Sequence, residues 1–172
     1  MIATPTPVAG DAAAFTELVR RYDPGLRALA FRLLGDRAAM DDALQEAYVK
    51  AFRGLGDFRG DAAFGTWLYR IAYRACLDHL RREGRHDTDP WPEIEPVGGD
   101  EPAATATARV DLARALGALP PDQRAAVLLV DAEGLDYDAA AAVLGVAPGT
   151  IASRLSRARA ALRAALAEGD PR

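Results

Sequence analysis

The sequence has little of the chemistry that many enzyme and secreted-protein classes need. It contains one cysteine, Cys76, and two histidines among 172 residues. A single cysteine excludes an intramolecular disulfide, and no Cys and His cluster has the spacing of a metal site. No segment approaches the roughly 20 apolar residues of a membrane span, and the start, MIATPTPVAGDAAAF, has no basic opening or apolar run. We therefore expect a cytoplasmic protein without cofactor, metal or membrane insertion.

β-Branched residues are also sparse, and no glycine-rich phosphate loop is present. Alanine, leucine and arginine are abundant instead, and these residues lose the least conformational entropy in a helix. The composition therefore predicts an all-α fold.

The formal net charge of −4 is unevenly distributed along the chain. Residues 84–108, GRHDTDPWPEIEPVGGDEPAATATA, are rich in proline, glycine and acids and lack helical or strand periodicity, which indicates a flexible linker. This acidic linker alone supplies more than the net negative charge, so the rest of the chain is close to neutral. We expect two small helical domains, residues 11–83 and 109–166, joined by it.

Proline, glycine and aspartate divide the first domain into helices. Pro24 suits a first helical position, Gly35 a left-handed helix end, and Asp36 and Asp61 can each cap the helix that follows. The predicted helices are 11–22, 24–34, 37–53 and 62–83.

The second domain ends in a pattern typical of a helix-turn-helix. After expected helices at 109–117 and 121–133, a short helix at 136–144 is followed by a turn at Gly145 and a longer helix that starts at Pro148. Two helices joined by so short a turn must cross steeply. The expected inward stripe of the longer helix is Ile151, Leu155, Ala158 and Leu162.

The other side of this last helix is polar and basic, and no acid lies between Asp138 and Leu166. Arginine and hydroxyl side chains suit phosphates and base edges, although such a helix can equally be a solvated face. The turn, Pro148 and the absence of acids together favour DNA binding. The candidate residues are Thr150, Ser153, Arg154, Arg157 and Arg159.

Two stretches of the first domain carry further candidates. FRGDAAFGTWLYRIAYRACLDHLRRE, residues 58–83, interleaves aromatics and arginines, as stacking on unpaired bases requires, although each aromatic could simply be packed. A Cys76 and His79 catalytic pair is disfavoured because no third group orients it. DDALQEAYVKAF, residues 41–52, groups polar side chains that suit a solvated face, a protein-binding face or, less simply, paired carboxylates.

Together these stretches resemble the extracytoplasmic-function sigma factors, a class of bacterial RNA polymerase subunits. The resemblance implies that DDALQEAYVKAF binds core polymerase, that residues 58–82 recognise and melt the −10 element, and that residues 119–162 read the −35 element. The partners implied are core RNA polymerase (the β′ clamp and the β subunit), promoter DNA and an anti-sigma factor.

The resemblance also assigns individual residues. Those implied to bind polymerase are Asp41, Asp42, Leu44, Gln45, Glu46 and Tyr48. Those implied to form or support the −10 surface are Arg59, Gly60, Asp61, Phe64, Thr66, Trp67, Arg70 and Arg74. Those implied to meet the −35 element are Thr150, Ser153, Arg154 and Arg157.

The predicted function is that of a non-catalytic polymerase subunit that confers promoter specificity. An autonomous helix-turn-helix regulator is the alternative, but it leaves residues 41–52 and the aromatic helix without a role. An enzyme that uses Cys76 and His79, or the carboxylates of Asp41 and Asp42, is a further alternative, and the sequence offers it no supporting motif.

Overall fold

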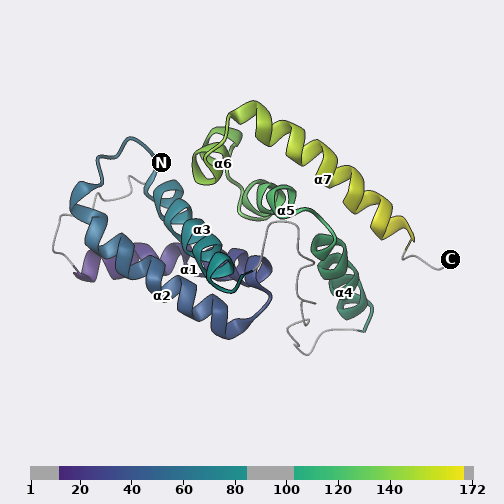
Figure 1. The fold of residues 1–172 in the computed structure, drawn as a ribbon, viewed down its shortest axis with the longest axis horizontal. Coiled ribbons are helices and arrows are strands. Elements are labelled where there is room, and N and C mark those ends of the chain that lie inside the picture. Colours follow the sequence, from purple (N-terminus) through teal and green to yellow (C-terminus); the bar gives the residue numbers. More distant parts are fainter. Residues whose placement is uncertain (1–11, 85–102, 169–172) are drawn as a thin grey trace.

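The computed structural model describes residues 12–84 and 103–168, and every regular element in these two ranges is helical (Figure 1). The all-α prediction is confirmed. The helices are α1 (Ala12–Leu34), α2 (Arg37–Gly54), α3 (Phe64–Arg82), α4 (Ala103–Gly117), α5 (Pro121–Val127), α6 (Tyr137–Leu144) and α7 (Pro148–Glu168). Two short helices, the 3₁₀-helix η1 (Leu55–Asp57) and the π-helix η2 (Leu128–Ala132), follow α2 and α5. Most of the predicted linker lies outside the described residues, and α4 begins at Ala103, before the expected start near Arg109.

Helix α1 is continuous, so the predicted break at Pro24 is wrong. A proline inside a helix costs about 3 kcal/mol because it removes one backbone hydrogen bond and crowds the preceding turn. The apolar stripe nevertheless continues through this position, with Leu18 before Pro24 and Leu26 and Leu29 after it, all three buried. Burial of each leucine contributes about 1.5–3 kcal/mol, so packing on both sides of Pro24 offsets its cost.

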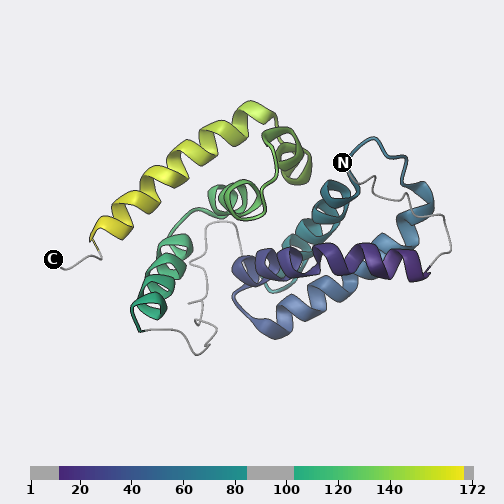
Figure 2. The same ribbon diagram turned by 180° about the vertical axis from the view of Figure 1, so that it is seen from behind.

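Helices α1, α2 and α3 pack together around one core, with α1 crossing α2 and α3 (Figure 2). Gly35 ends α1 with φ 72°, and the Asp36 carboxylate accepts a hydrogen bond from the Ala39 amide at 2.7 Å, so both predicted boundary roles are confirmed. The predicted cap at Asp61 is wrong. Helix α3 begins two residues later, with Ala63 as its N-cap and no side-chain cap bond.

The helix-turn-helix predicted at the end of the chain is present. Asp136 caps α6 through the Ala139 amide at 2.7 Å, Gly145 ends it with φ 68°, and α7 starts at Pro148. The two helices are bent by 97° to one another, as the short turn requires. No single helix in the described ranges is long and apolar enough to cross a membrane. Helices α6 and α7 reach the necessary length and apolar content only when they are taken together as this bent pair.

Arg124 holds α4 and α5 together from within the core. Its Nε donates to the Leu116 carbonyl at 2.7 Å, and its Nη2 donates to the carbonyls of Gly117 and Leu119. These carbonyls lie at and just after the end of α4, where a helix leaves its last acceptors without partners. The buried guanidinium therefore acts as a C-terminal cap for α4.

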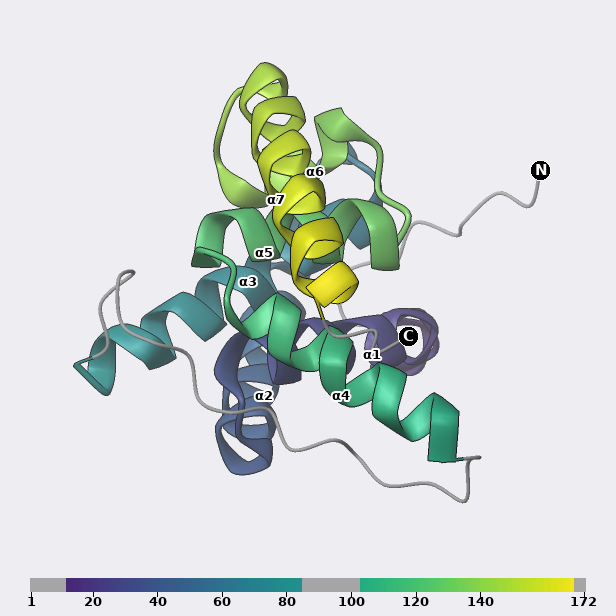
Figure 3. The same cartoon turned by 90° about the vertical axis from the view of Figure 1, so that its right-hand side faces the viewer.

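The carboxy-terminal helices (α4–α7) pack directly on the amino-terminal helices (α1–α3). Helix α6 lies against α3, and α5 touches α1 (Figure 3). One continuous hydrophobic cluster includes Leu68 of α3 as well as Ala140 and Val143 of α6. The described helices therefore form a single packed body.

Cys76 is buried in α3, and burial raises the pKa of its thiol to about 12. The reactive form of cysteine is the thiolate, which is scarce in the native state at neutral pH. We expect iodoacetamide at pH 8 to modify native Cys76 a hundredfold or more slowly than urea-unfolded protein, since each pKa unit is about a factor of ten. Equal rates would contradict this.

Because the folded pKa of Cys76 is raised, the thiol's contribution to the free energy of unfolding is present below about pH 9 and is lost as the pH rises towards 12.

Candidate nucleic-acid and protein interfaces

The polar residues of α2 line a groove between α2 and the end of α3. The groove has a volume of about 700 Å³ and carries both signs of charge. Three of the predicted polymerase-binding residues, Asp42, Gln45 and Glu46, form part of its wall. The remaining lining residues are Val49, Lys50, Arg53, His79, Arg82 and Glu83. A groove of mixed charge with an apolar side chain, Val49, in its wall suits a protein partner.

Ion pairs fix the side chains around this groove. Glu46 bridges the two helices, because its carboxylate lies 2.9 Å from Lys50 Nζ on α2 and 2.9 Å from Arg82 Nη2 on α3. The hydrogen bond from Lys50, with a further one from Arg82, lowers the pKa of Glu46. Glu46 is therefore held ionised across the groove, where an incoming cationic side chain meets a preformed acceptor.

Two other predicted polymerase-binding residues bond to α1. Arg27 Nη1 donates to Asp41 at 2.7 Å, and the Tyr48 hydroxyl donates to Asp23 at 2.6 Å. Burial, together with the Asp23 hydrogen bond, raises the pKa of Tyr48, so its hydroxyl stays protonated. Asp41 and Tyr48 thus tie α2 to α1.

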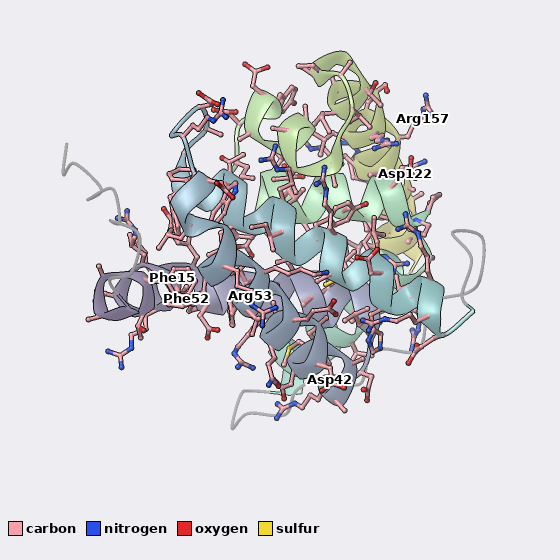
Figure 4. The ribbon with its side chains drawn as sticks, turned by 60° about the vertical axis from the view of Figure 1, so that its left-hand side comes forward. Phe15, Asp42, Phe52, Arg53, Asp122 and Arg157 are labelled. Carbon is pink, nitrogen blue, oxygen red and sulfur yellow. The ribbon has the colours of Figure 1, made fainter. Side chains whose placement is uncertain are left out.

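Leu44 is 1% exposed and belongs to the core, so a polymerase contact by this side chain is blocked in this conformation. Sequence reasoning missed two apolar residues on the outer face of α2 instead. Val49 and Phe52 are each 43% exposed, and Phe52 lies beside Phe15 of α1, with ring centroids 5.4 Å apart (Figure 4). The signal was available, because they follow Gln45 by four and seven residues and share its helix face.

The aromatic residues before and within α3 form a compact cluster. Phe64 contacts Phe58 edge-on at 5.8 Å between ring centroids, and Trp67 lies 5.1 Å from Phe58. Phe64 is buried, so it supports the predicted −10 surface from below, whereas Trp67 is partly exposed. The loop that crosses this cluster presents Arg59 and Asp61 to solvent.

The remaining predicted −10 residues lie at different places on this surface. Gly60 has φ 75°, a left-handed conformation that favours glycine, in the loop between Phe58 and α3. Arg74 is exposed and Arg70 is half-buried on α3. Thr66 lines a groove that α3 shares with the carboxy-terminal helices. The structure thus brings Arg59, Gly60, Asp61 and Trp67 to one end of α3 and leaves Arg74 two turns further along.

Helix α7 turns its predicted apolar stripe to the core and Arg157 to solvent. Ile151, Leu155 and Ala158 are buried, whereas Arg157 is exposed on the outer side of α7 (Figure 4). Thr150 and Ser153 are partly exposed, and the Ser153 hydroxyl donates to the Thr150 carbonyl at 2.9 Å.

The neighbouring arginines are held by acids of α5 and η2, which sequence reasoning did not find. Arg154 Nε lies 3.0 Å from Asp122, and the Arg154 side chain is 21% exposed. Arg159 pairs with Asp131 through two nitrogens, and the hydrogen bond to Asp131 raises the pKa of Arg159. Asp131 therefore holds Arg159 in a bond within the fold, and Asp122 orients Arg154. Of these two arginines and Arg157, Arg157 is the most accessible to DNA.

The helix-turn-helix with its basic outer face defines a DNA-binding protein, which also carries a groove of mixed charge and an aromatic, arginine-flanked surface. Within the two described ranges, no group of His, Cys, Asp or Glu side chains is arranged to hold a metal ion. Residues 18–86 match the family model of sigma-70 region 2, and residues 109–162 match that of sigma-70 region 4. The chain belongs to the extracytoplasmic-function family of RNA polymerase sigma factors.

Individual relatives agree with this assignment. The chain is 48% identical over 155 residues to the ECF RNA polymerase sigma factor SigM of Mycobacterium tuberculosis, covering 90% of this chain and 78% of SigM. The structure of CnrH in complex with the cytosolic domain of CnrY is similar with a TM-score of 0.71 and 31% identity, over 94% of this chain and 92% of CnrH. The sigma factor RpoE of Bartonella quintana, in complex with the anti-sigma factor NepR, gives a TM-score of 0.74 and 30% identity, over 88% and 96% of the two chains.

Family membership settles the general function predicted from the sequence. The protein is a cytoplasmic, non-enzymatic sigma factor that binds core RNA polymerase and directs it to promoter DNA. The alternatives of an autonomous regulator and of an enzyme are thereby set aside. In agreement, the Cys76 thiol stays protonated in the core and is no nucleophile.

Proposed function

We propose that three surfaces of this chain divide the work of promoter recognition. The groove of α2 and α3 binds the polymerase, with Asp42, Gln45 and Glu46 as its polar contacts to the β′ clamp. The loop at residues 59–61 and the exposed strip of α3 recognise and melt the −10 element. The outer face of α7 reads the −35 element, and the acidic segment at 84–108 links the two DNA-binding domains.

The observation that carries this proposal is the preformed state of the polymerase groove. Glu46 is held between Lys50 and Arg82 at 2.9 Å from each, so the polar wall needs little reordering on binding. Val49 and Phe52 supply exposed apolar surface on the same helix face, which is the combination of apolar anchor and polar rim that stable interfaces use.

The −10 surface suits an unpaired base. Trp67 is partly exposed beside Phe58, and Arg59 and Arg74 are exposed on either side along the chain. Base stacking on an aromatic side chain contributes about 1–3 kcal/mol, which offsets the few kcal/mol needed to take a base out of the duplex. In this way binding energy drives strand separation without any chemical step by this chain.

We propose that an anti-sigma factor is a further partner. Two similar structures are complexes of a sigma factor with the anti-sigma factor NepR or with the cytosolic domain of CnrY. Val49 lines the groove that the polymerase would use, and exposed Phe52 lies on the same helix face, so both offer apolar surface to such an inhibitor.

Changing both Gln45 and Glu46 to alanine should weaken binding to core polymerase by about tenfold or more. The reason is loss of two adjacent polar contacts and of the bridge to Arg82. The measurement is a titration of fluorescently labelled protein with purified core enzyme. Glu17→Ala, which removes an exposed acid of α1 outside the groove, is the matched control and should bind normally. Unchanged affinity of the double variant would contradict the assigned groove.

A further inference from the structure

One hydrogen bond joins the two halves of the molecule. The Tyr69 hydroxyl of α3 donates to the Glu133 carboxylate, which follows η2, at 2.6 Å. Tyr69 is buried, and burial together with this bond to Glu133 raises the pKa of Tyr69. The hydroxyl therefore remains a donor to the carboxylate throughout the physiological pH range.

Gly25 of α1 makes room for this contact. A Cβ atom placed on Gly25 would overlap both the Glu133 carboxylate and the Tyr69 hydroxyl. Glycine inside a helix is destabilising relative to alanine. Helix α1 thus carries a glycine, which weakens a helix, directly after Pro24 and at the point where α1, α3 and the segment after η2 meet.

The contact also places the carboxy-terminal helices over part of the proposed −10 surface. Beside it lies a groove of about 410 Å³, lined by Thr66 and Tyr69 of α3 and by Gly134, Leu135 and Ala139 from the other half. Helices α3 and α6 pack directly against each other along this boundary (Figure 3). Thr66 is therefore covered on one side by the helix-turn-helix.

This packed arrangement is incompatible with simultaneous binding of both promoter elements. Sites centred about 10 and 35 base pairs from the start of transcription are about 25 base pairs apart, or about 85 Å at 3.4 Å per base pair. Helix α7 has 21 residues and spans only about 32 Å, and its partner α6 touches α3. The two halves must separate before α3 and α7 can reach their elements together.

We propose that the Tyr69–Glu133 hydrogen bond seated over Gly25 is a latch that keeps the free sigma factor closed, and that promoter engagement requires its release. The inference rests on the proposed −10 and −35 roles of α3 and α7. Because only the open form can bind both elements, the apparent promoter affinity equals the intrinsic affinity multiplied by the open fraction. A weakened latch should therefore increase promoter binding by holoenzyme at limiting concentrations.

The test uses the full chain with dyes on two introduced cysteines, Glu17→Cys in α1 and Ala164→Cys in α7, both exposed. Energy transfer between the dyes should be high in the wild-type protein and lower in Gly25→Ala and in Glu133→Ala. We expect the ratio of closed to open molecules to fall about tenfold, equivalent to about 1.4 kcal/mol. Gly117→Ala is the matched control, because a Cβ there meets open space, and it should match the wild type.

A second measurement, thermal unfolding, separates loss of the latch from damage to the fold. Gly25→Ala should leave the thermal stability of the open protein equal or higher, since alanine favours the helix. Equal energy transfer in wild type, Gly25→Ala and Glu133→Ala would overturn the latch. High transfer retained in wild-type holoenzyme bound to promoter DNA would overturn it as well. Failure of the wild type to bind polymerase or promoter would instead reject the proposed function, while the measurements on the free protein would still decide the latch.

Discussion

Replacing Arg124 by methionine should lower the free energy of unfolding of the carboxy-terminal helices by about 3 kcal/mol or more. The change removes three hydrogen bonds to the carbonyls of Leu116, Gly117 and Leu119. The Leu116 carbonyl keeps a bond from the Leu119 amide at 3.2 Å, but the other two carbonyls lose the guanidinium as a donor, and each acceptor left without a donor costs about 1–3 kcal/mol. Burial lowers the pKa of Arg124 to about 10, so the guanidinium is still charged at pH 7 and its hydrogen bonds are charge-assisted.

The measurement is urea unfolding followed by circular dichroism. Arg114→Ala is the matched control, because this arginine of α4 is exposed and its ion pair with Asp111, at 3.6 Å, lies at the surface. Surface pairs contribute about 0–1 kcal/mol, so the control should unfold close to the wild type. A loss for Arg124→Met no larger than that of the control would show that the buried guanidinium does not cap α4.

Among Arg154, Arg157 and Arg159 of α7, the change Arg157→Ala should produce the largest loss of promoter binding. Arg157 is exposed, whereas Arg154 is paired with Asp122 and Arg159 with Asp131. A bidentate contact to guanine discriminates against other bases by about 1–3 kcal/mol, so its removal weakens binding to the preferred promoter by about tenfold to a hundredfold. Arg159→Ala should have a smaller effect on DNA binding because Asp131 already occupies that side chain.

The measurement is binding of holoenzyme to promoter variants over a series of salt concentrations. Loss of preference at one base would identify Arg157 as a reader of sequence. A uniform loss with a shallower salt dependence would identify a phosphate contact. Unchanged binding at every salt concentration would show that the basic face of α7 is merely solvated.

Local patterns were sufficient to predict the helix-turn-helix. Asp136, Gly145 and Pro148 each act within a few residues of their position in the chain, so the start, end and turn could be read from the sequence. Pro24 shows the limit of such rules. Its local preference for a helix start was overridden by the buried leucines on either side, whose packing depends on α2 and α3.

The residues that connect distant segments could not be predicted. Tyr69 and Glu133 lie 64 positions apart, and no periodicity links them to Gly25. Nothing in the sequence indicated the role of Arg124, because its three carbonyl acceptors come together only once α4 is packed against α5. The ion pair of Asp122 with Arg154 likewise forms only because α7 packs against α5.

Dependence on tertiary packing also explains why only some of the predicted polymerase-binding and −10 residues are exposed. The sequence identified the helices that carry these sites, and Asp42, Gln45 and Glu46 do line one groove. It did not separate supporting from exposed residues, since Leu44 and Phe64 are buried whereas Val49 and Phe52 are exposed. Burial depends on which face each helix turns to its neighbours.

Run-off transcription tests the central claim most directly. Purified core polymerase is given a library of randomised promoter templates, with wild-type protein, with the Gln45→Ala and Glu46→Ala double variant, or without sigma factor. The wild type should produce transcripts from templates that share a −10 and a −35 element, and the double variant should yield far fewer transcripts from the same templates. Transcripts that are identical in amount and sequence with and without the wild-type protein would contradict the account.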